Sequence, residues 1–219
     1  MDERDAWITA LADEAAQAAR EAFTRCAASA ITDAGKALEF MAPDDAVRGL
    51  AVATAMGGSL ARGTCALLDG GNGYAAAALL RQMVEVEYLW WTFADDAEDA
   101  ARWLHASRSQ LANHFRPAQM RERSNGLFRS AEYQAHCNQG GHPSPAGHAL
   151  VSTSPPFDVM RMMRVDLGQH LERGWGLLVT ACAAVDRSGA VQRDTNAVEA
   201  ARRDWHEHDP LAQRSALPD

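Results

Sequence analysis

The sequence predicts an all-α fold, organised as one antiparallel helical bundle of about five to seven helices over residues 1–219. Apolar residues recur along the chain at intervals of three and four, which is the spacing of one helix face, rather than with the alternation typical of strands. Hydrophobic residues make up 47% and charged residues 23% of the chain, as in an ordinary globular domain. We find neither an internal repeat nor a linker-like segment, so a single domain accounts for the whole chain.

Two helices are expected in the first third of the chain. An alanine-rich helix is predicted over about residues 2–40, either continuous or broken at the segment Thr32–Gly35. Pro43 and the two aspartates after it form a helix-start signal, because acidic side chains interact favourably with the amino-terminal end of the helix dipole. The second helix then runs to about Leu68. Its Gly57-Gly58 pair costs about 1 kcal/mol per glycine relative to alanine, so we expect a closely packed neighbour there.

The strongest helical pattern covers Tyr74 to about Ala94. Apolar residues occupy more than half of its circumference, which predicts a central and largely buried helix. A fourth helix is predicted from the Asp95-Asp96 pair to about Phe115, where Arg116-Pro117 stops it.

The last third of the chain is dominated by one long helix, predicted from Phe157 to about Asp186. Its apolar residues recur at near-heptad intervals, so it should pack along most of the bundle. The remaining predicted segments are two short helices at about 118–124 and 127–138, a Gly/Pro-rich loop at 140–156, a weak helix at 196–206 and a polar tail at about 207–219.

The charge balance excludes a generally cationic surface. Lysine and arginine total 21 against 29 aspartates and glutamates, which gives a formal net charge of −8. A generally basic nucleic-acid or membrane binder is therefore excluded, and any polyanion site must be local. We expect a cytoplasmic protein, because the four cysteines are widely spaced and the acidic start has no signal-peptide pattern. We expect no membrane span, because the sequence lacks an apolar run of about 18 residues. The glycine-rich turn at 70–73 is not preceded by a strand, so we expect neither a phosphate-binding loop nor a cofactor.

Arg81, Glu85 and Tyr88 share one face of the strongest helix, because they lie at i, i+4 and i+7. A charge on an otherwise apolar helix must be paired, or its burial is very costly. The Arg81–Glu85 pair is therefore either a structural ion pair that fixes the register of the helix or one wall of a binding site.

Three histidines, His136, His142 and His148, follow at intervals of six in a segment rich in glycine and proline. Imidazole is the commonest metal ligand, but this spacing matches neither a helical i, i+4 pair nor a zinc finger, so we expect no metal site. His142 either ends a helix and leads into a proline-stiffened loop or takes part in a site on that loop.

The residues that carry a family resemblance are Arg81-Gln-Met-Val-Glu85, Asp95, Trp103, Arg121-Glu-Arg123, Tyr133 and His142-Pro143-Ser144-Pro145. In this order they resemble a bacterial all-α family of unassigned function, which has an Arg-x-x-x-Glu helix, an acidic break and a Tyr…Ser…His-Pro-Ser-Pro motif. The resemblance covers about residues 50–185. Cys137 stands where the family has a serine, and the Gly140-Gly141 pair before the histidine also departs from the family pattern.

More distantly, the helical pattern resembles that of HEPN-type proteins, many of which are ribonucleases or companions of toxin and phage-defence systems. That resemblance implies an Arg-x(4–6)-His motif, whose two side chains assist metal-independent cleavage of RNA by its own 2′-hydroxyl. The motif occurs five times here and so selects no site by itself. Its occurrences are Arg108–His114, Arg129–His136, Arg164–His170, Arg202–His208 and Arg203–His208. The Arg203–His208 occurrence best fits the stricter form of the motif, with a polar residue after the arginine, but Pro210 follows it and leaves little helix to position it. The Arg129–His136 occurrence has the better context, because it lies inside the family-like region and just before His142.

Two hypotheses of function follow. In the first, a site between the strongest helix and residues 129–148 recognises a nucleotide or RNA phosphate and cleaves RNA. In the second, the chain is a non-catalytic interaction protein, such as an antitoxin-like or adaptor-like homodimer, in which the same residues are structural. The net charge of −8 favours the second hypothesis, and a group of four arginines at positions 116–129 favours the first. The candidate catalytic residues are His142, His136 and Arg129, and the candidate binding residues are Arg81, Glu85, Tyr133, Arg121 and Arg123.

Overall fold

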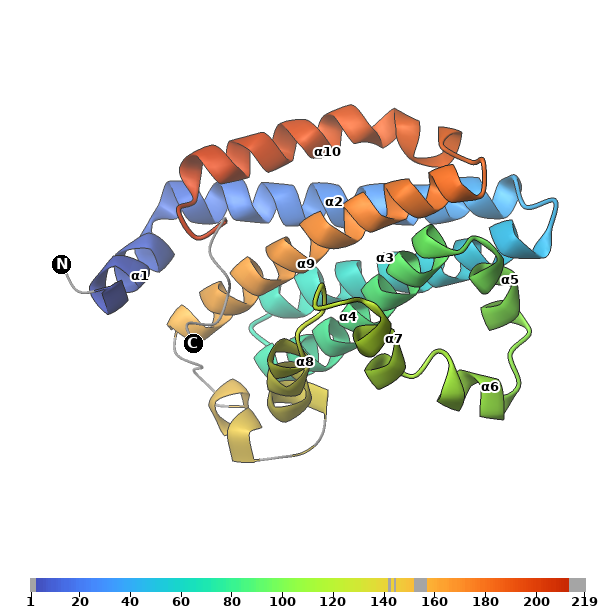
Figure 1. Cartoon of the computed structure of the whole chain (residues 1–219). Helices are drawn as coiled ribbons and strands as arrows, with labels where there is room; N and C mark the ends of the chain where they lie inside the picture. Colours follow the sequence, from blue (N-terminus) through green and yellow to red (C-terminus); the bar gives the residue numbers. More distant parts are fainter. Residues whose placement is uncertain (1–2, 142, 144, 152–156, 213–219) are drawn as a thin grey trace.

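The computed structural model describes residues 3–141, 143, 145–151 and 157–212, and all of the regular elements in these ranges are helical (Figure 1). This confirms the all-α prediction. The described residues form ten α-helices rather than about five to seven, so the predicted number is not confirmed. The elements are α1 (Glu3–Ala12), α2 (Glu14–Phe40), α3 (Asp45–Asp69), α4 (Gly73–Asp95), α5 (Glu98–Leu104), α6 (Arg108–Asn113), α7 (Pro117–Arg123), α8 (Ser130–His136), the π-helical turn η1 (Cys137–Gly141), the 3-10 turn η2 (Pro145–Leu150), α9 (Phe157–Ala184) and α10 (Gly189–His208).

Helix α4 is the centre of the bundle. It packs against α3 and α9 along its length and also contacts the short elements α5, α7, α8 and η1. Met83, Trp90 and Phe93 on this helix are completely buried. Figure 1 shows α10 running beside α2 on one side of the molecule and the short helices α5 to α8 on the other. The prediction of a central, buried helix from Tyr74 to about Ala94 is therefore confirmed.

The Gly57-Gly58 pair inside α3 does have close neighbours. A Cβ atom on Gly57 would lie 2.6 Å from the ring of Trp90 on α4, and one on Gly58 would lie 2.7 Å from the hydroxyl of Thr32 on α2. The indole nitrogen of Trp90 also donates a hydrogen bond of 3.3 Å to Thr54 on α3. Close approach of α2 and α4 to α3 thus offsets the helix-weakening effect of the glycine pair.

The break in the first predicted helix lies at Asp13 instead of Thr32–Gly35. The Asp13 side chain accepts a 2.9 Å hydrogen bond from the amide of Ala16 and thereby caps the start of α2. The Thr32 hydroxyl donates to the carbonyl of Ala28 at 2.8 Å, so this residue is accommodated inside the helix.

The predicted fourth helix is likewise divided in two. Ser107 begins α6 with a capping box, in which its side chain accepts from the amide of Gln110 while the Gln110 side chain accepts from the amide of Ser107. This local start signal ends α5 before it can continue to Phe115. The predicted Gly/Pro-rich loop contains the turn η2 and the end of η1, and the predicted weak helix at 196–206 is part of the longer α10.

A buried ion pair anchors the end of α10 to α2. The Arg20 Nε atom donates to Asp209 Oδ2 at 2.7 Å, and both side chains have 0% of their surface exposed. The Trp205 indole donates to the same carboxylate oxygen at 2.7 Å, and its ring stacks on Phe23 with a centroid distance of 4.7 Å. Residues 209–212 at the start of the predicted polar tail are therefore held against the core, and residues 213–219 lie outside the described part.

Among the helices described, none is both long enough and apolar enough to cross a lipid bilayer.

We expect Asp209→Asn to lower the free energy of unfolding by about 3–5 kcal/mol, because it leaves the buried Arg20 guanidinium without a counter-charge. Two nitrogens of Arg20 already have no hydrogen-bond partner among the described residues. Urea unfolding followed by circular dichroism measures the change. The control is Glu98→Gln, which removes an ion pair with Arg102. The Glu98 side chain is 81% exposed, so this substitution should lower the free energy of unfolding by less than about 1 kcal/mol. Equal losses in the two variants would contradict the prediction.

Candidate metal centre

Two carboxylate–histidine pairs face each other where α8 meets α9. Glu132 and His136 lie four residues apart on α8, and Asp166 and His170 lie four residues apart on α9. A spacing of four places both members of a pair on one face of a helix, about one turn apart. The two helices therefore bring two imidazoles and two carboxylates together.

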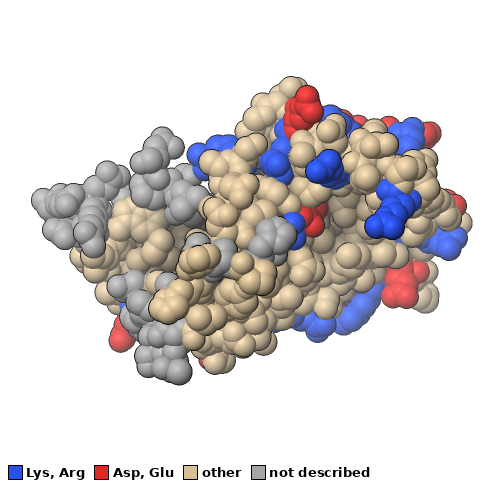
Figure 2. Space-filling model, turned by 90° about the horizontal axis from the view of Figure 1, so that it is seen from below, with Lys and Arg blue, Asp and Glu red and all other residues tan. Residues whose placement is uncertain are grey.

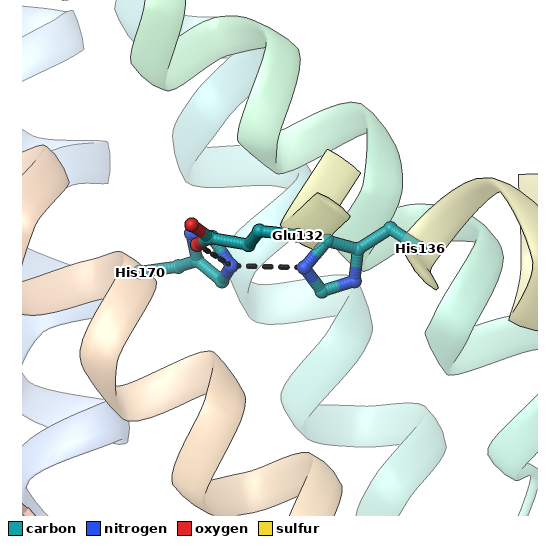
Figure 3. Close-up of side chains that lie close together, drawn as sticks. All are labelled: Glu132, His136 and His170. Atoms are coloured by element: carbon teal, nitrogen blue, oxygen red, sulfur yellow. Dashed lines mark hydrogen bonds and ion pairs between the residues drawn. The ribbon is translucent and has the colours of Figure 1, made fainter. Parts of the chain in front are cut away.

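Three of these side chains form a compact group. The Nε2 atoms of His136 and His170 lie 3.1 Å apart, and Glu132 Oε1 lies 3.5 Å from His170 Nε2. Figure 3 shows the two imidazole rings pointing toward each other from opposite sides, with the Glu132 carboxylate beside His170. One ligand atom from each residue lies within 4.8 Å of the others, which makes the group a candidate metal site.

Glu87 on α4 supports this group from behind. Its Oε2 atom lies 2.8 Å from Nδ1 of His170, and its other oxygen accepts from Nε of Arg173. Because a carboxylate only accepts, the His170 contact makes Nδ1 the donor and leaves Nε2 directed at the site. Arg173 Nη2 also lies 3.0 Å from His170 Nδ1, but two donors do not bond to each other. The Arg173 Nη2 atom donates instead to Glu132 Oε1 at 2.8 Å.

Asp166 completes the surroundings of the two histidines. Its Oδ1 atom lies 3.6 Å from His170 Nε2, and its Oδ2 atom lies 3.7 Å from His136 Nδ1. These distances are too long for direct hydrogen bonds. The Asp166 carboxylate is therefore placed to approach either a ligand bound between the imidazoles or the outer nitrogen of His136.

The site is buried on the histidine side and open on the carboxylate side. His170 is 1% exposed and His136 5% exposed, and Glu87 is completely buried. Glu132, Asp166 and Arg173 are partly exposed. Among the described residues, three carboxylates and the guanidinium of Arg173 thus surround the two imidazoles, and this balance favours a positively charged occupant.

The pKa shifts reflect the same surroundings. Burial lowers the pKa of His136. Burial also acts to lower the pKa of His170, but the charge and hydrogen bond of Glu87 outweigh it and raise that pKa. Burial acts to raise the pKa of Glu132, whereas Arg173 and His170 outweigh it and lower that pKa. Glu132 is therefore ionised and His136 neutral near neutral pH, the forms in which both side chains bind metal ions, whereas metal binding by His170 requires loss of the Nε2 proton that Glu87 favours.

The turn η1 holds α8 in position. Gly140 in this turn is packed so closely on α4 that a Cβ atom there would lie 2.5 Å from the backbone nitrogen of Ala78. Only glycine allows this approach of two backbones without a shift of one of them. Gly140 thus lies at the contact between α4 and the turn that directly follows His136.

The predicted binding residues Arg81, Glu85 and Tyr133 also come together. Arg81 Nη2 donates to the Tyr133 hydroxyl at 2.8 Å, and that hydroxyl donates to Glu85 Oε1 at 2.7 Å. Arg81 and Glu85 form an ion pair of 2.7 Å along α4. Burial, the hydrogen bond to Glu85 and the charge of Glu85 raise the pKa of Tyr133, so it stays protonated. Tyr88 does not join them, because its ring is buried against Phe128 with a centroid distance of 4.2 Å.

The other predicted residues lie in different places. Arg121 stacks over the ring of Tyr133, whereas Arg123 donates to the buried Asp99 at 3.1 Å. Arg129 is more than half exposed and reaches Glu132 only at 4.0 Å. His142 lies outside the described residues, so its predicted place beside an arginine stays a prediction.

Sequence reasoning missed four residues of the site, namely Glu87, Asp166, His170 and Arg173. His170 did occur in the Arg164–His170 motif, but Arg164 is directed at Asp69, to which it donates at 2.6 Å. The available signal was the repeated carboxylate-x-x-x-His spacing at 132–136 and 166–170. Pairing His136 with His142 and His148 obscured it.

Comparison of the chain with protein-family models, with curated proteins and with solved structures gave no match in any of the three.

We expect Glu87→Gln to lower the melting temperature by about 6–12 °C. The buried contacts to His170 and Arg173 lose their charge, which costs about 3 kcal/mol and shifts the midpoint of a domain of this size by that amount. Differential scanning calorimetry measures the shift. Glu85→Gln, two residues away on the same helix and about one-third exposed, is the matched control, and its shift should stay below about 4 °C. A Glu87→Gln midpoint no lower than that of the control would refute a supporting role for Glu87.

Proposed function

We propose that the chain is a metal-dependent enzyme whose centre holds one divalent first-row transition metal ion through Glu132, His136 and His170. The observation that carries the proposal is the convergence of one carboxylate and two imidazole nitrogens from α8 and α9 into a single group. Imidazole with carboxylate is a ligand set that suits zinc, iron, manganese and cobalt ions.

The separation of the two imidazole nitrogens supports this assignment. Nitrogen ligands lie about 2.1 Å from such an ion, so neighbouring ligands at tetrahedral to right angles are about 3.0–3.4 Å apart. The His136 and His170 Nε2 atoms are 3.1 Å apart. Little movement of either ring is needed for both nitrogens to bind the same ion.

The supporting residues fit the same proposal. A histidine that binds a metal ion usually donates its other ring nitrogen to a carboxylate, which orients the ring and increases its basicity. Glu87 accepts from Nδ1 of His170 at 2.8 Å, and Asp166 lies near Nδ1 of His136. Three carboxylates in a site with two buried imidazoles also provide the negative charge that a divalent cation requires.

Three protein ligands are the number typical of catalytic rather than structural sites. An ion held in this way keeps a coordination position for water or substrate, where it can polarise a bound group or lower the pKa of bound water. The partly exposed Glu132 and Asp166 mark the side from which a small molecule would enter.

We expect purified, chelator-treated protein to bind one Zn²⁺ or Co²⁺ ion per chain in isothermal titration calorimetry. His136→Gln and Glu132→Gln should each weaken binding by more than about 100-fold, because loss of a ligand exceeds the effect typical of a supporting partner. His206→Gln is the matched control, since His206 also lies beside a carboxylate, Glu172, at 3.0 Å but outside the group of three. Absence of saturable binding, or equal affinities in all variants with native circular dichroism, would refute the metal centre.

Metal-independent RNA cleavage of the HEPN type is the second candidate. It is supported by the approach of His136 to His170, with the Arg173 guanidinium beside them, because two histidines and a cation can supply acid–base catalysis and phosphate binding. Burial of both histidines and the three nearby carboxylates disfavour an RNA phosphate at this place.

We expect the wild-type protein to leave labelled RNA intact when EDTA is present. The measurement is gel electrophoresis of an end-labelled oligoribonucleotide, with His136→Ala protein prepared in parallel. Cleavage in EDTA by the wild type that is lost in His136→Ala would support the RNase instead of the metal centre.

A further inference from the structure

A second group of charged side chains lies beside the proposed centre, around the ring of Tyr133. The Arg121 guanidinium carbon lies 4.2 Å from the centroid of this ring, and that of Arg81 lies 5.5 Å from it. Arg81 reaches the ring from α4, and Arg121 reaches it from α7. One tyrosine ring on α8 thus contacts two guanidinium groups from two other helices.

Three nitrogens of these guanidinium groups are buried without a hydrogen-bond partner among the described residues. They are Nε and Nη1 of Arg121 and Nε of Arg81. A buried donor without an acceptor costs about 1–3 kcal/mol, and such donors are rare in folded proteins. Three of them around one ring indicate a place that is built to receive an acceptor.

The charge of this group is also incompletely balanced. Arg81 is paired with Glu85 at 2.7 Å, and Arg123 on the same short helix as Arg121 is paired with Asp99 at 3.1 Å. Arg121 has no carboxylate within 4.0 Å in the part of the chain that the structure describes. The group therefore carries an excess positive charge in a region of reduced solvent exposure, where the attraction for an anion is strong.

The arginine group and the proposed centre are adjacent. Tyr133 directly follows Glu132 on α8, and Tyr88, whose ring centroid lies 6.1 Å from that of Tyr133, directly follows Glu87 on α4. Burial raises the pKa of Tyr88, and the nearby Arg121 opposes that rise. Figure 2 shows that the face on the side of the short helices is hollowed near its middle, with basic and acidic side chains in the hollow.

We propose that Arg121 and Arg81 bind the carboxylate or phosphate group of a small molecule, which is the substrate of the adjacent metal centre. The assignment of this molecule as substrate rests on the proposed metal-dependent function, whereas the anion site itself does not. Guanidinium groups suit this task, because their planar donors match the oxygens of carboxylate and phosphate.

The burial of the unpartnered donors selects a small ligand. A terminal carboxylate or phosphate group can approach nitrogens that a continuous polymer backbone cannot. Arg81, with 21% of its side chain exposed, and Glu85, with 30%, connect the group to solvent.

The test uses metal-free protein in EDTA, so that it is independent of the metal centre. Nuclear magnetic resonance of the ¹⁵N-labelled arginine Nε–H groups follows titration with inorganic phosphate in one arm and with acetate in the other. A saturable shift of the Arg121 Nε–H signal is the expected result, and the arm with the higher affinity identifies the anionic group. Arg121→Gln should weaken binding by about tenfold or more, since it removes a charge-assisted contact, whereas Arg123→Gln on the same helix should not.

Two results would overturn the proposal. One is the absence of a saturable Arg121 shift with either anion in the wild-type protein, a result that does not depend on the folding of any variant. The other is equal anion affinity in Arg121→Gln and Arg123→Gln. If the anion binds but the metal titration fails, the anion site stands and its assignment to a metal-dependent substrate falls.

Discussion

The buried carboxylate of Glu87 is the interaction on which the candidate centre depends. It lies on α4, in the middle of the bundle, where an unpaired charge would be very unfavourable. His170 and Arg173 are both on α9 and each meets one of its oxygens. These contacts fix the rotation of α9 about its axis relative to α4. They also turn Nε2 of His170 away from the core and toward α8.

The position of α8 needs a separate explanation, because a helix of seven residues is marginal by itself. Its Tyr133 hydroxyl lies between Arg81 and Glu85 of α4, and the close contact of Gly140 holds the turn that follows. The Arg81–Glu85 pair is thus structural in one respect, since it anchors α8 to the central helix. By holding α8, the Arg81–Glu85 pair also aligns Glu132 and His136 with α9. The two interpretations of this pair, a structural ion pair and a wall of a site, are therefore compatible.

Much of this could be predicted from the sequence wherever a local pattern determines the outcome. The apolar circumference of residues 74–94 predicted the central helix, and the Gly57-Gly58 pair predicted a close neighbour. Prediction failed where two segments distant in the sequence had to meet. The pairs 132–136 and 166–170 are visible as spacings, but only the side-chain contacts of α8 with α9 in the folded chain show that their faces coincide. Glu87 gave no signal, because a glutamate on an apolar helix does not reveal its partner.

Consecutive residues of α8 serve two environments of opposite charge. Neighbouring residues in a helix point about 100° apart, so Glu132 and Tyr133 face different elements. Glu132 faces α9 and its histidines within a set of carboxylates, whereas Tyr133 faces two arginines of α4 and α7. A cation can therefore bind on the Glu132 side of this helical turn and an anion on the Tyr133 side, without competing for the same residues. The acidic net charge of −8 is compatible with this arrangement, because each proposed site depends on the charges next to it and not on the charge of the whole surface.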